Sequence, residues 1–262
     1  MAWPADWLRP QWAAGGPAGV VAGATNRAIG AVMTTRAGGI SAAPFDTFNL
    51  RAGLGDTAAA VAANHEALAL GVGRAPVFLE QVHGTRVVRL TRADALPGAP
   101  VHVADASITT ETGRACAVQV ADCLPVLFAA PAGRGVGAAH AGWRGLAGGV
   151  LEATVQALCV AAACEPHELQ AWLGACIGPQ RFEVGRDVVD AFGAPSAGRF
   201  APHAAEKWLA DLPGLARDRL RAAGVTAVSG GGWCTVSDAS RFFSYRRDRV
   251  TGRMAALVWI DD

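Results

Sequence analysis

The stretch that most constrains the fold of this chain is residues 120–145, which read VADCLPVLFAAPAGRGVGAAHAGWRG. It holds two short apolar runs, residues 125–130 and 135–139, joined by a turn rich in proline and glycine. Apolar runs of this length between turn residues are typical of buried strands, so we predict a buried hairpin. Cys123 and His140 lie at the ends of the two runs. The hairpin therefore carries a thiol and an imidazole at its rim, where chemistry is expected.

Composition limits the class of protein. The chain has 262 residues, of which 52% are hydrophobic, and this is enough for a large core without disulfides. The formal charge of +1 gives no support to binding of nucleic acid or of a membrane surface through overall charge. Because the sequence shows no secretory signal and no apolar span of membrane length, we expect a cytoplasmic protein that acts on a small molecule. The six cysteines are then expected to be reduced thiols.

Periodicity and turn residues predict alternating strands and helices, which we interpret as one α+β domain over residues 1–262, with residues 1–26 as a cap or edge segment. The expected strands are one that starts at Ala28, two that meet at Gly84, and residues 104–110, 170–173 and 254–260. The expected helices are residues 57–70, with Asp56 as N-cap and Gly71 as stop, a buried helix after His140, and residues 186–192 and 207–223. A polar loop containing His203 precedes the last of these.

Three side chains suited to metal binding occur at turns or strand ends: His83 in QVHG, Cys123 in VADC and His140 in AAHAGW. Two imidazoles and a thiolate make a three-ligand zinc site, whose fourth position stays open for water or substrate. The separations of 40 and 17 residues match no compact zinc-finger pattern, so spacing alone is a weak signal. Two other interpretations stay open: satisfied core residues, and a thiolate and imidazole pair for nucleophilic catalysis.

Trp143 and Arg144 follow His140 closely and open the next predicted helix. The amino end of a helix, together with an arginine, is a natural site for a phosphate group. We therefore predict that Trp143 and Arg144 form a platform for a base and a phosphate beside the thiol and the imidazole.

Five blocks of the sequence together resemble the YfiH family of laccase-domain, or multicopper polyphenol oxidase-like, proteins: QVHG, ADCLPVLF, HAGWRG, GACIGPQRFEVG and FFSYRRDRVTGRMA. The resemblance covers residues 28–260 and implies an α/β/β/α sandwich similar to the cytotoxic necrotizing factor deamidases. It implies zinc bound by His83, Cys123 and His140, which are then also the catalytic residues. The implied activity is phosphorolysis of adenosine, inosine and methylthioadenosine, with adenosine deamination as a companion. Purine nucleosides and phosphate are the implied partners, and we expect a monomer or a homodimer.

By the same resemblance, Arg36 in TTRAGGIS and Asn49 in FNLRAG fall on family motifs around the pocket. We assign Arg36 and Arg144 to phosphate as a hypothesis, because a dianion needs forked cationic donors. A surface or structural role for both arginines is the alternative that the sequence leaves open.

Deamination by a metal-bound water needs a proton shuttle. The His-x-Glu signature of zinc deaminases is absent, since Thr85 lies two residues after His83. The nearest carboxylates in the sequence are Asp122 and Glu80.

Two further functions stay open. Two histidines and a cysteine also bind copper when a methionine completes the set, and Met33 and Met254 are available, although six histidines are too few for a multicopper oxidase. A cysteine hydrolase or amidase, with a role in peptidoglycan precursor editing, would use Cys123 and His140 instead.

Overall fold

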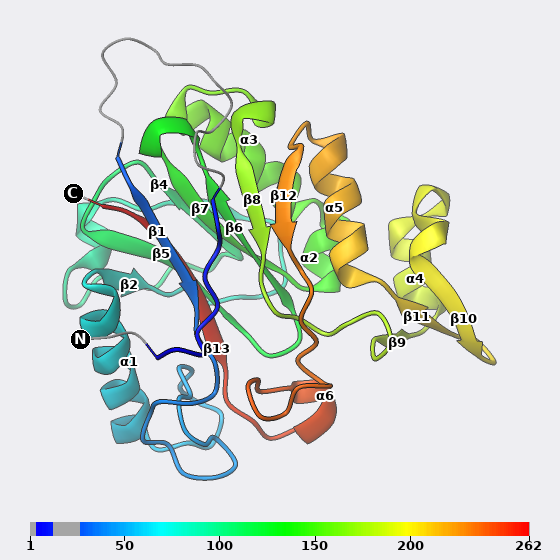
Figure 1. The fold of residues 1–262 in the computed structure, drawn as a ribbon, viewed down its shortest axis with the longest axis horizontal. Coiled ribbons are helices and arrows are strands. Elements are labelled where there is room, and N and C mark those ends of the chain that lie inside the picture. Colours follow the sequence, from blue (N-terminus) through cyan, green and yellow to red (C-terminus); the bar gives the residue numbers. More distant parts are fainter. Residues whose placement is uncertain (1–3, 13–26, 262) are drawn as a thin grey trace.

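The computed structural model of the chain describes residues 4–12 and 27–261, and its elements stack in four layers (Figure 1). Two β-sheets face each other in the middle. Helix α1 (Ala58–Val72) packs on the outer face of one sheet, and helices α3 (Val150–Ala162) and α5 (Leu212–Ala222) pack on the outer face of the other. The predicted α/β/β/α sandwich is therefore confirmed.

The first sheet has four strands in the order β1-β13-β5-β2. They are β1 (Ile29–Met33), β13 (Met254–Ile260), β5 (Arg114–Val120) and β2 (Ala75–Val77). The central pair, β13 and β5, is antiparallel, with Met254 opposite Val120. This register brings the residues before β13 next to the residues after β5, among which is Cys123.

The second sheet has six strands in the order β12-β8-β6-β7-β4-β3. They are β12 (Ala227–Gly230), β8 (Gln170–Leu173), β6 (Leu124–Ala129), β7 (Val136–Ala141), β4 (Ala106–Thr109) and β3 (Val87–Arg89). Strands β6 and β7 form the predicted hairpin, in which Pro125 lies opposite His140.

A third, smaller sheet stands at the side of the sandwich (Figure 1). Its strands, in the order β10-β11-β9, are β10 (Phe200–Ala204), β11 (Lys207–Ala210) and β9 (Glu183–Val184). The remaining helices are α2 (Trp143–Gly148), α4 (Arg186–Phe192) and α6 (Tyr245–Asp248). Short 3-10 turns are η1 (Arg92–Ala95), η2 (Pro131–Gly133), η3 (Pro166–Glu168) and η4 (Ala194–Arg199).

Strand β13 explains how the layers are joined, because its side chains alternate between two cores. One set packs between the two sheets and the other packs under α1. The first set is Met254, Ala256, Val258 and Ile260, and the second is Ala255, Leu257 and Trp259. A strand covered on both faces has no solvent-facing position, which is why residues 254–260 read as an unbroken apolar run.

Three predicted boundaries are wrong for local reasons. Helix α1 is capped by Thr57, whose side chain accepts from the Ala60 N–H at 3.2 Å, rather than by Asp56. It also runs past Gly71 to end at Gly73, which adopts a left-handed conformation with φ 65°. The helix expected after His140 is split into α2 and α3 by Gly149, which has φ 100°.

Three other predictions are wrong because tertiary pairing decides the structure. The helix expected over residues 207–223 begins only at Leu212, since Lys207–Ala210 is strand β11, paired with β10. His203 lies in β10 rather than in a loop. The two strands expected to meet at Gly84 are instead separated by a long loop, residues 78–86, which carries His83.

The described part of the predicted edge segment lies against the first sheet. Leu8 pairs with Met33 of β1, and the ring of Trp7 stacks on Phe48 at 5.6 Å between centroids. The rest of that prediction, over residues 1–3 and 13–26, falls outside the described residues. Among the helices of residues 4–12 and 27–261, none combines the length and the apolar character needed to cross a membrane.

Candidate metal centre and substrate pocket

The structure brings together the three predicted metal ligands. One donor atom from each of His83, Cys123 and His140 lies within 4.8 Å of the others. His140 belongs to β7, Cys123 directly precedes β6, and His83 lies in the loop between β2 and β3. The Cys123 Sγ is 3.7 Å from the His83 Nε2, and the two imidazole rings meet edge to face at 4.8 Å between centroids. The hairpin thus supplies two donors and a distant loop supplies the third.

A buried carboxylate that the sequence analysis missed, Asp105, holds this arrangement. Its Oδ1 accepts from the His140 Nδ1 and from the His83 backbone N–H, both at 2.8 Å. Its Oδ2 accepts from the backbone N–H groups of Gly84 at 2.7 Å and Val82 at 3.1 Å. The carboxylate therefore fixes the loop in which His83 has φ 61°, and it leaves the Nε2 of His140 free for a metal.

The thiol and the imidazole shift each other's pKa. Burial alone would raise the pKa of Cys123, but the charge and hydrogen bond of His140, together with His83, lower it to about 6. Burial alone would lower the pKa of His140, but the Cys123 thiolate and Asp105 raise it to about 9. At neutral pH Cys123 is therefore a thiolate, the form that binds metals and acts as a nucleophile.

Gly142 leaves the space that a metal centre needs. A Cβ atom at this position would stand 2.7 Å from the His83 Cδ2 and 3.0 Å from the Cys123 Sγ. Its φ of −64° and ψ of 156° are open to any residue, so close approach, and not backbone freedom, requires glycine here.

A pocket of about 260 Å³ opens beside Cys123. Its walls come from the turn after β5, the start of α2, the loop after β8 and the segment around α6. The lining residues are Ala121, Asp122, Cys123, Gly142, Trp143, Arg144, Ile177, Phe182, Leu212, Tyr245 and Arg246. Arg144 lies over the ring of Trp143 at 4.3 Å, so both predicted platform residues reach the pocket.

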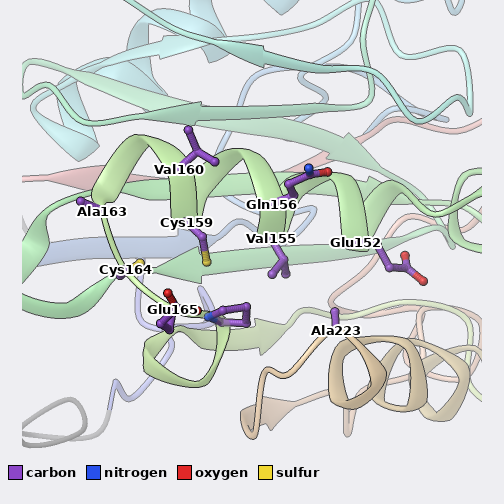
Figure 2. A pocket seen from close by; sticks show the side chains of 10 residues that line it. Glu152, Val155, Gln156, Cys159, Val160, Ala163, Cys164, Glu165 and Ala223 are labelled. Carbon is purple, nitrogen blue, oxygen red and sulfur yellow. The ribbon is translucent and has the colours of Figure 1, made fainter.

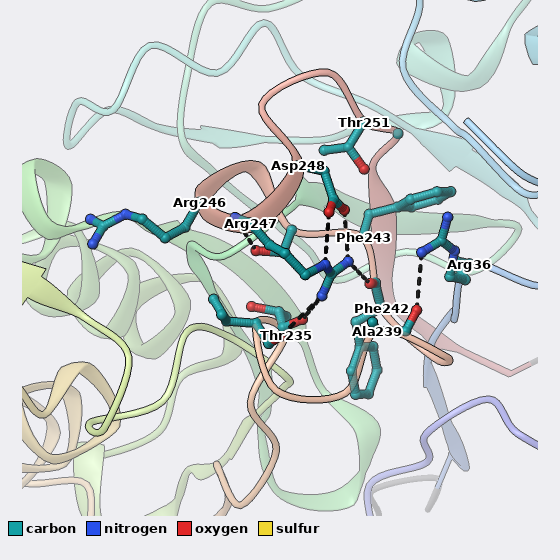
Figure 3. Close-up of polar contacts among 12 residues, drawn as sticks. Arg36, Thr235, Ala239, Phe242, Phe243, Arg246, Arg247, Asp248 and Thr251 are labelled. Carbon is teal, nitrogen blue, oxygen red and sulfur yellow. Dashed lines mark hydrogen bonds and ion pairs between the residues drawn. The ribbon is translucent and has the colours of Figure 1, made fainter. Parts of the chain in front are cut away.

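The loop that carries Tyr245 and Arg246 to the pocket is tied by Arg247 (Figure 3). The Arg247 guanidinium donates to the carbonyls of Thr235 at 2.7 Å and Phe242 at 2.9 Å, while it pairs with Asp248 at 2.7 Å. From the sequence, this segment, SYRRD, stands out only as part of a block that resembles the YfiH family. Its hydrogen-bonding role depends on a fold-back that no local pattern predicts.

Arg36 and Asn49 lie outside this pocket lining. The Arg36 guanidinium donates to the Ala239 carbonyl at 3.0 Å (Figure 3). It also donates to the Asp46 carbonyl at 3.0 Å and pairs with the Asp46 carboxylate at 3.1 Å. It also lies over the Phe243 ring at 4.9 Å. These contacts favour the structural role that the sequence left open for Arg36.

Asn49 is fully buried, and all its polar contacts are within the protein. Its Nδ2 donates to the Arg51 carbonyl at 3.0 Å and to the Asp56 carboxylate at 2.9 Å. Its Oδ1 accepts from the backbone N–H groups of Arg51 at 3.1 Å and Arg253 at 3.0 Å. Asn49 therefore positions two arginines.

The methionine sulfurs and the nearest carboxylates already have partners within the protein. Met33 and Met254 are fully buried between the sheets, where each sulfur accepts a backbone N–H, from Ala175 at 3.2 Å and Phe243 at 3.1 Å respectively. The Asp122 carboxylate accepts from the Thr235 hydroxyl at 2.6 Å and from the Arg246 backbone N–H at 2.7 Å. Glu80 pairs with Arg51 at 3.4 Å.

A larger hollow, of about 500 Å³, lies over α3, and none of the three candidate ligands lines it (Figure 2). Cys159 and Cys164 are the thiols that face it. Burial raises the pKa of Cys159 to about 12 and also raises that of Cys164, so both are protonated and unreactive at neutral pH. The thiol that is ionised at neutral pH, Cys123, lies at the smaller pocket instead.

A family model described as multi-copper polyphenol oxidoreductase laccase matches residues 30–261. The chain belongs to this family, the YfiH family. A Pseudomonas aeruginosa relative, named purine nucleoside phosphorylase, is 48% identical over 260 residues, which cover 98% of this chain and 99% of that protein. Escherichia coli K12 YfiH, which carries the same enzyme name, is 46% identical over 241 residues, covering 89% and 95%.

A solved YfiH-like structure agrees with the fold. The crystal structure of a Neisseria meningitidis protein superposes with a TM-score of 0.86 at 45% identity and covers 98% of this chain and 100% of that one. The resemblance to the YfiH family that five sequence blocks indicated is therefore confirmed.

Proposed function

We propose that this chain is a metal-dependent purine nucleoside phosphorylase and that its metal is zinc. The observation that carries the proposal is the meeting of His83, Cys123 and His140 beside a pocket walled by an indole and two guanidinium groups. Relatives at 46–48% identity that bear this enzyme name support it. The proposed substrates are adenosine, inosine and methylthioadenosine, with deamination of adenosine as a companion activity. We propose a cytoplasmic monomer or homodimer.

The donor set fits a metal. Cys123 is ionised at neutral pH, the Nε2 of His140 is free, and Gly142 leaves room beside both His83 and Cys123. Zinc held by two imidazoles and one thiolate keeps an open position and supplies a Lewis acid there. Asp105 would keep the two histidines oriented, which is the common role of a carboxylate behind a metal-binding imidazole.

In phosphorolysis, the protein contributes mainly by positioning the two substrates and by stabilising the charge that develops in the transition state. An oxygen of phosphate bonds to C1′ of the ribose while the C1′–N9 bond breaks, and the electron pair of that bond leaves with the base, which takes up a proton. Trp143 offers a ring face on which a purine stacks. Arg144, stacked on that ring, adds positive charge at the pocket.

Phosphorolysis, rather than deamination, is proposed as the main reaction because a proton shuttle is missing from the expected positions. Asp122 lines the pocket, but both of its oxygens accept hydrogen bonds from the protein, and Glu80 is not among the residues that line the pocket. Neither carboxylate lies among the metal-binding group.

The proposal is tested with protein of measured metal content, incubated with each nucleoside in the presence and absence of phosphate. We expect adenine from adenosine and methylthioadenosine, and hypoxanthine from inosine, to appear only with phosphate, each with an equal amount of the matching sugar 1-phosphate, which keeps the methylthio group in the case of methylthioadenosine. Folded, metal-loaded protein that forms no free base from any of the three nucleosides refutes the proposal. Hypoxanthine formed from adenosine through inosine, followed separately, measures the companion deamination.

One observation favours a second candidate, a cysteine hydrolase. The pKa of Cys123 is about 6 and His140 lies beside it, as in a nucleophile and base pair. The two candidates differ in how metal affects alkylation. If Cys123 is a metal ligand, zinc slows its reaction with iodoacetamide; if it is a free nucleophile, the rate is unchanged by zinc.

A further inference from the structure

Arg253 lies beside the candidate metal centre, although it was not assigned a role from the sequence. It precedes β13, and because Met254 is paired with Val120, Arg253 stands next to the residues that lead to Cys123. Its guanidinium lies 5.9 Å from the centroid of the Tyr245 ring, and that ring lines the pocket together with Cys123. Arg253 therefore borders the site where the reaction is proposed to occur.

The guanidinium of Arg253 is half-buried, and its hydrogen bonds go to backbone carbonyls rather than to a carboxylate. It donates to the carbonyls of Thr251 and Gly252, both at 3.0 Å. Within residues 4–12 and 27–261, no carboxylate oxygen accepts a hydrogen bond from it. Burial lowers the pKa of Arg253 and the charge of Arg51 lowers it further, while the charges of Cys123 and Asp122 raise it, so the guanidinium lies within electrostatic reach of all three. Two guanidinium groups are thus held near each other in a place where their repulsion is only partly screened.

The contacts of the Arg51 guanidinium are long, so it keeps the capacity to bind a further partner. It meets the Gln119 Oε1 at 3.5 Å and Glu80 at 3.4 Å, both long contacts, and the Glu80 side chain is 58% exposed. An exposed ion pair of this kind contributes little. The buried Asn49 accepts from the backbone N–H groups of both Arg51 and Arg253, so the two arginines are brought together by one side chain.

We propose that Arg51 and Arg253 form the subsite that holds the phosphate co-substrate, while Trp143 and Arg144 contact the nucleoside. This rests on the proposed phosphorolysis. An anion between two guanidinium groups relieves their repulsion and accepts forked hydrogen bonds, which a dianionic phosphate does well. Asn49 then acts as a positioning residue, and the hypothesis that Arg36 binds phosphate is replaced.

The test combines binding and kinetics on zinc-loaded protein. Binding of inorganic phosphate is measured by titration calorimetry, and the KM values for phosphate and for inosine are measured separately. The variants are Arg51→Gln, Arg253→Gln and Arg253→Lys, with Arg249→Gln as matched control, because Arg249 is exposed and lies over the same Tyr245 ring at 5.8 Å. Circular dichroism and metal content establish that each variant is folded and loaded.

We expect Arg51→Gln and Arg253→Gln each to raise the Kd and KM for phosphate by roughly 10- to 100-fold, the effect of losing a charged hydrogen bond, with the KM for inosine within about twofold. Arg253→Lys should recover part of the loss, and Arg249→Gln should match the wild type. The subsite is refuted if wild-type protein binds no phosphate, or if Arg253→Gln binds it as well as the control.

The two proposals fail in different ways. Wild-type protein that binds phosphate through Arg253 but cleaves no nucleoside keeps the subsite and refutes the phosphorylase. Wild-type protein that cleaves inosine with phosphate, while Arg253→Gln has an unchanged KM for phosphate, keeps the phosphorylase and refutes the subsite.

Discussion

Gly142→Ala should remove the metal while leaving the fold intact. The backbone of Gly142, with φ −64° and ψ 156°, suits alanine, so the substitution costs nothing in conformation. Its Cβ, however, would lie 2.7 Å from the His83 Cδ2, where ordinary contact begins at 3.4 Å. The His83 ring must therefore retreat by about 0.7 Å, the difference of those two distances.

A displacement of this size exceeds the tolerance of a metal centre, since metal–ligand distances hold to about 0.2 Å. The Cβ would also stand 3.0 Å from the Cys123 Sγ, so moving the ring alone does not relieve the crowding. We expect zinc affinity to fall by roughly 10- to 100-fold or more, which is about 1.4 to 2.7 kcal/mol of binding free energy.

The assay is competition for zinc against a chromogenic chelator, with thermal melting of the metal-free protein beside it. Gly232→Ala is the matched control, because a Cβ at Gly232 meets nothing within 4 Å. We expect Gly232→Ala to bind zinc as the wild type does, and both variants to melt within a few degrees of it. Zinc affinity of Gly142→Ala within twofold of the control would refute the reasoning.

Three further outcomes follow from the site. Asp105→Asn should lower the free energy of unfolding by about 3 kcal/mol or more and weaken zinc binding, because an amide can replace only part of four accepted hydrogen bonds; chemical denaturation and chelator competition measure the two effects. Zinc binding between pH 6 and 9 should release about one proton, since the raised pKa of His140, about 9, leaves it protonated there while the lowered pKa of Cys123, about 6, leaves it ionised. Affinity should then rise about tenfold per pH unit across that window, and calorimetry in buffers of different ionisation enthalpy checks the proton count. Arg144→Ala should raise the KM for inosine about tenfold with metal content unchanged, measured by steady-state kinetics.

Each of these outcomes has a contrary result. Asp105→Asn that is as stable as the wild type would mean that the buried carboxylate is not needed to hold the histidines. Zinc affinity that is flat between pH 6 and 9 would mean that zinc displaces no proton from His140, so its pKa is not raised in the metal-free protein. An unchanged KM for inosine in Arg144→Ala would remove that arginine from the nucleoside site.

Strands and helices with strong local patterns could be predicted to the residue. The strands Gln170–Leu173 and Met254–Ile260 and the helix Arg186–Phe192 have the expected bounds, because apolar runs and turn residues mark both ends. Lys207–Ala210 could not be predicted, because it becomes a strand only by pairing with β10. A segment of four residues is too short to show a periodic pattern of its own.

The residues of the candidate site also differ in whether the sequence could predict them. His83, Cys123 and His140 could be named because their motifs resemble those of a family, whereas spacing alone gave a weak signal. Asp105 carried a signal that was not used: it falls inside the strand predicted over residues 104–110, and a carboxylate that a sheet buries needs partners. The approach of Arg253 to Cys123 depends on the register of β13 against β5, and no sequence pattern contains that register.

The most direct test of a metal-dependent phosphorylase is a titration of metal-free protein with Zn²⁺ while ribose 1-phosphate formation from inosine is followed. Because the ligand group consists of His83, Cys123 and His140, we predict that the rate rises linearly and stops rising at one zinc per chain. We also predict that Cys123→Ala stays inactive throughout. Full activity before any zinc is added, or no ribose 1-phosphate at one zinc per chain, would contradict the account.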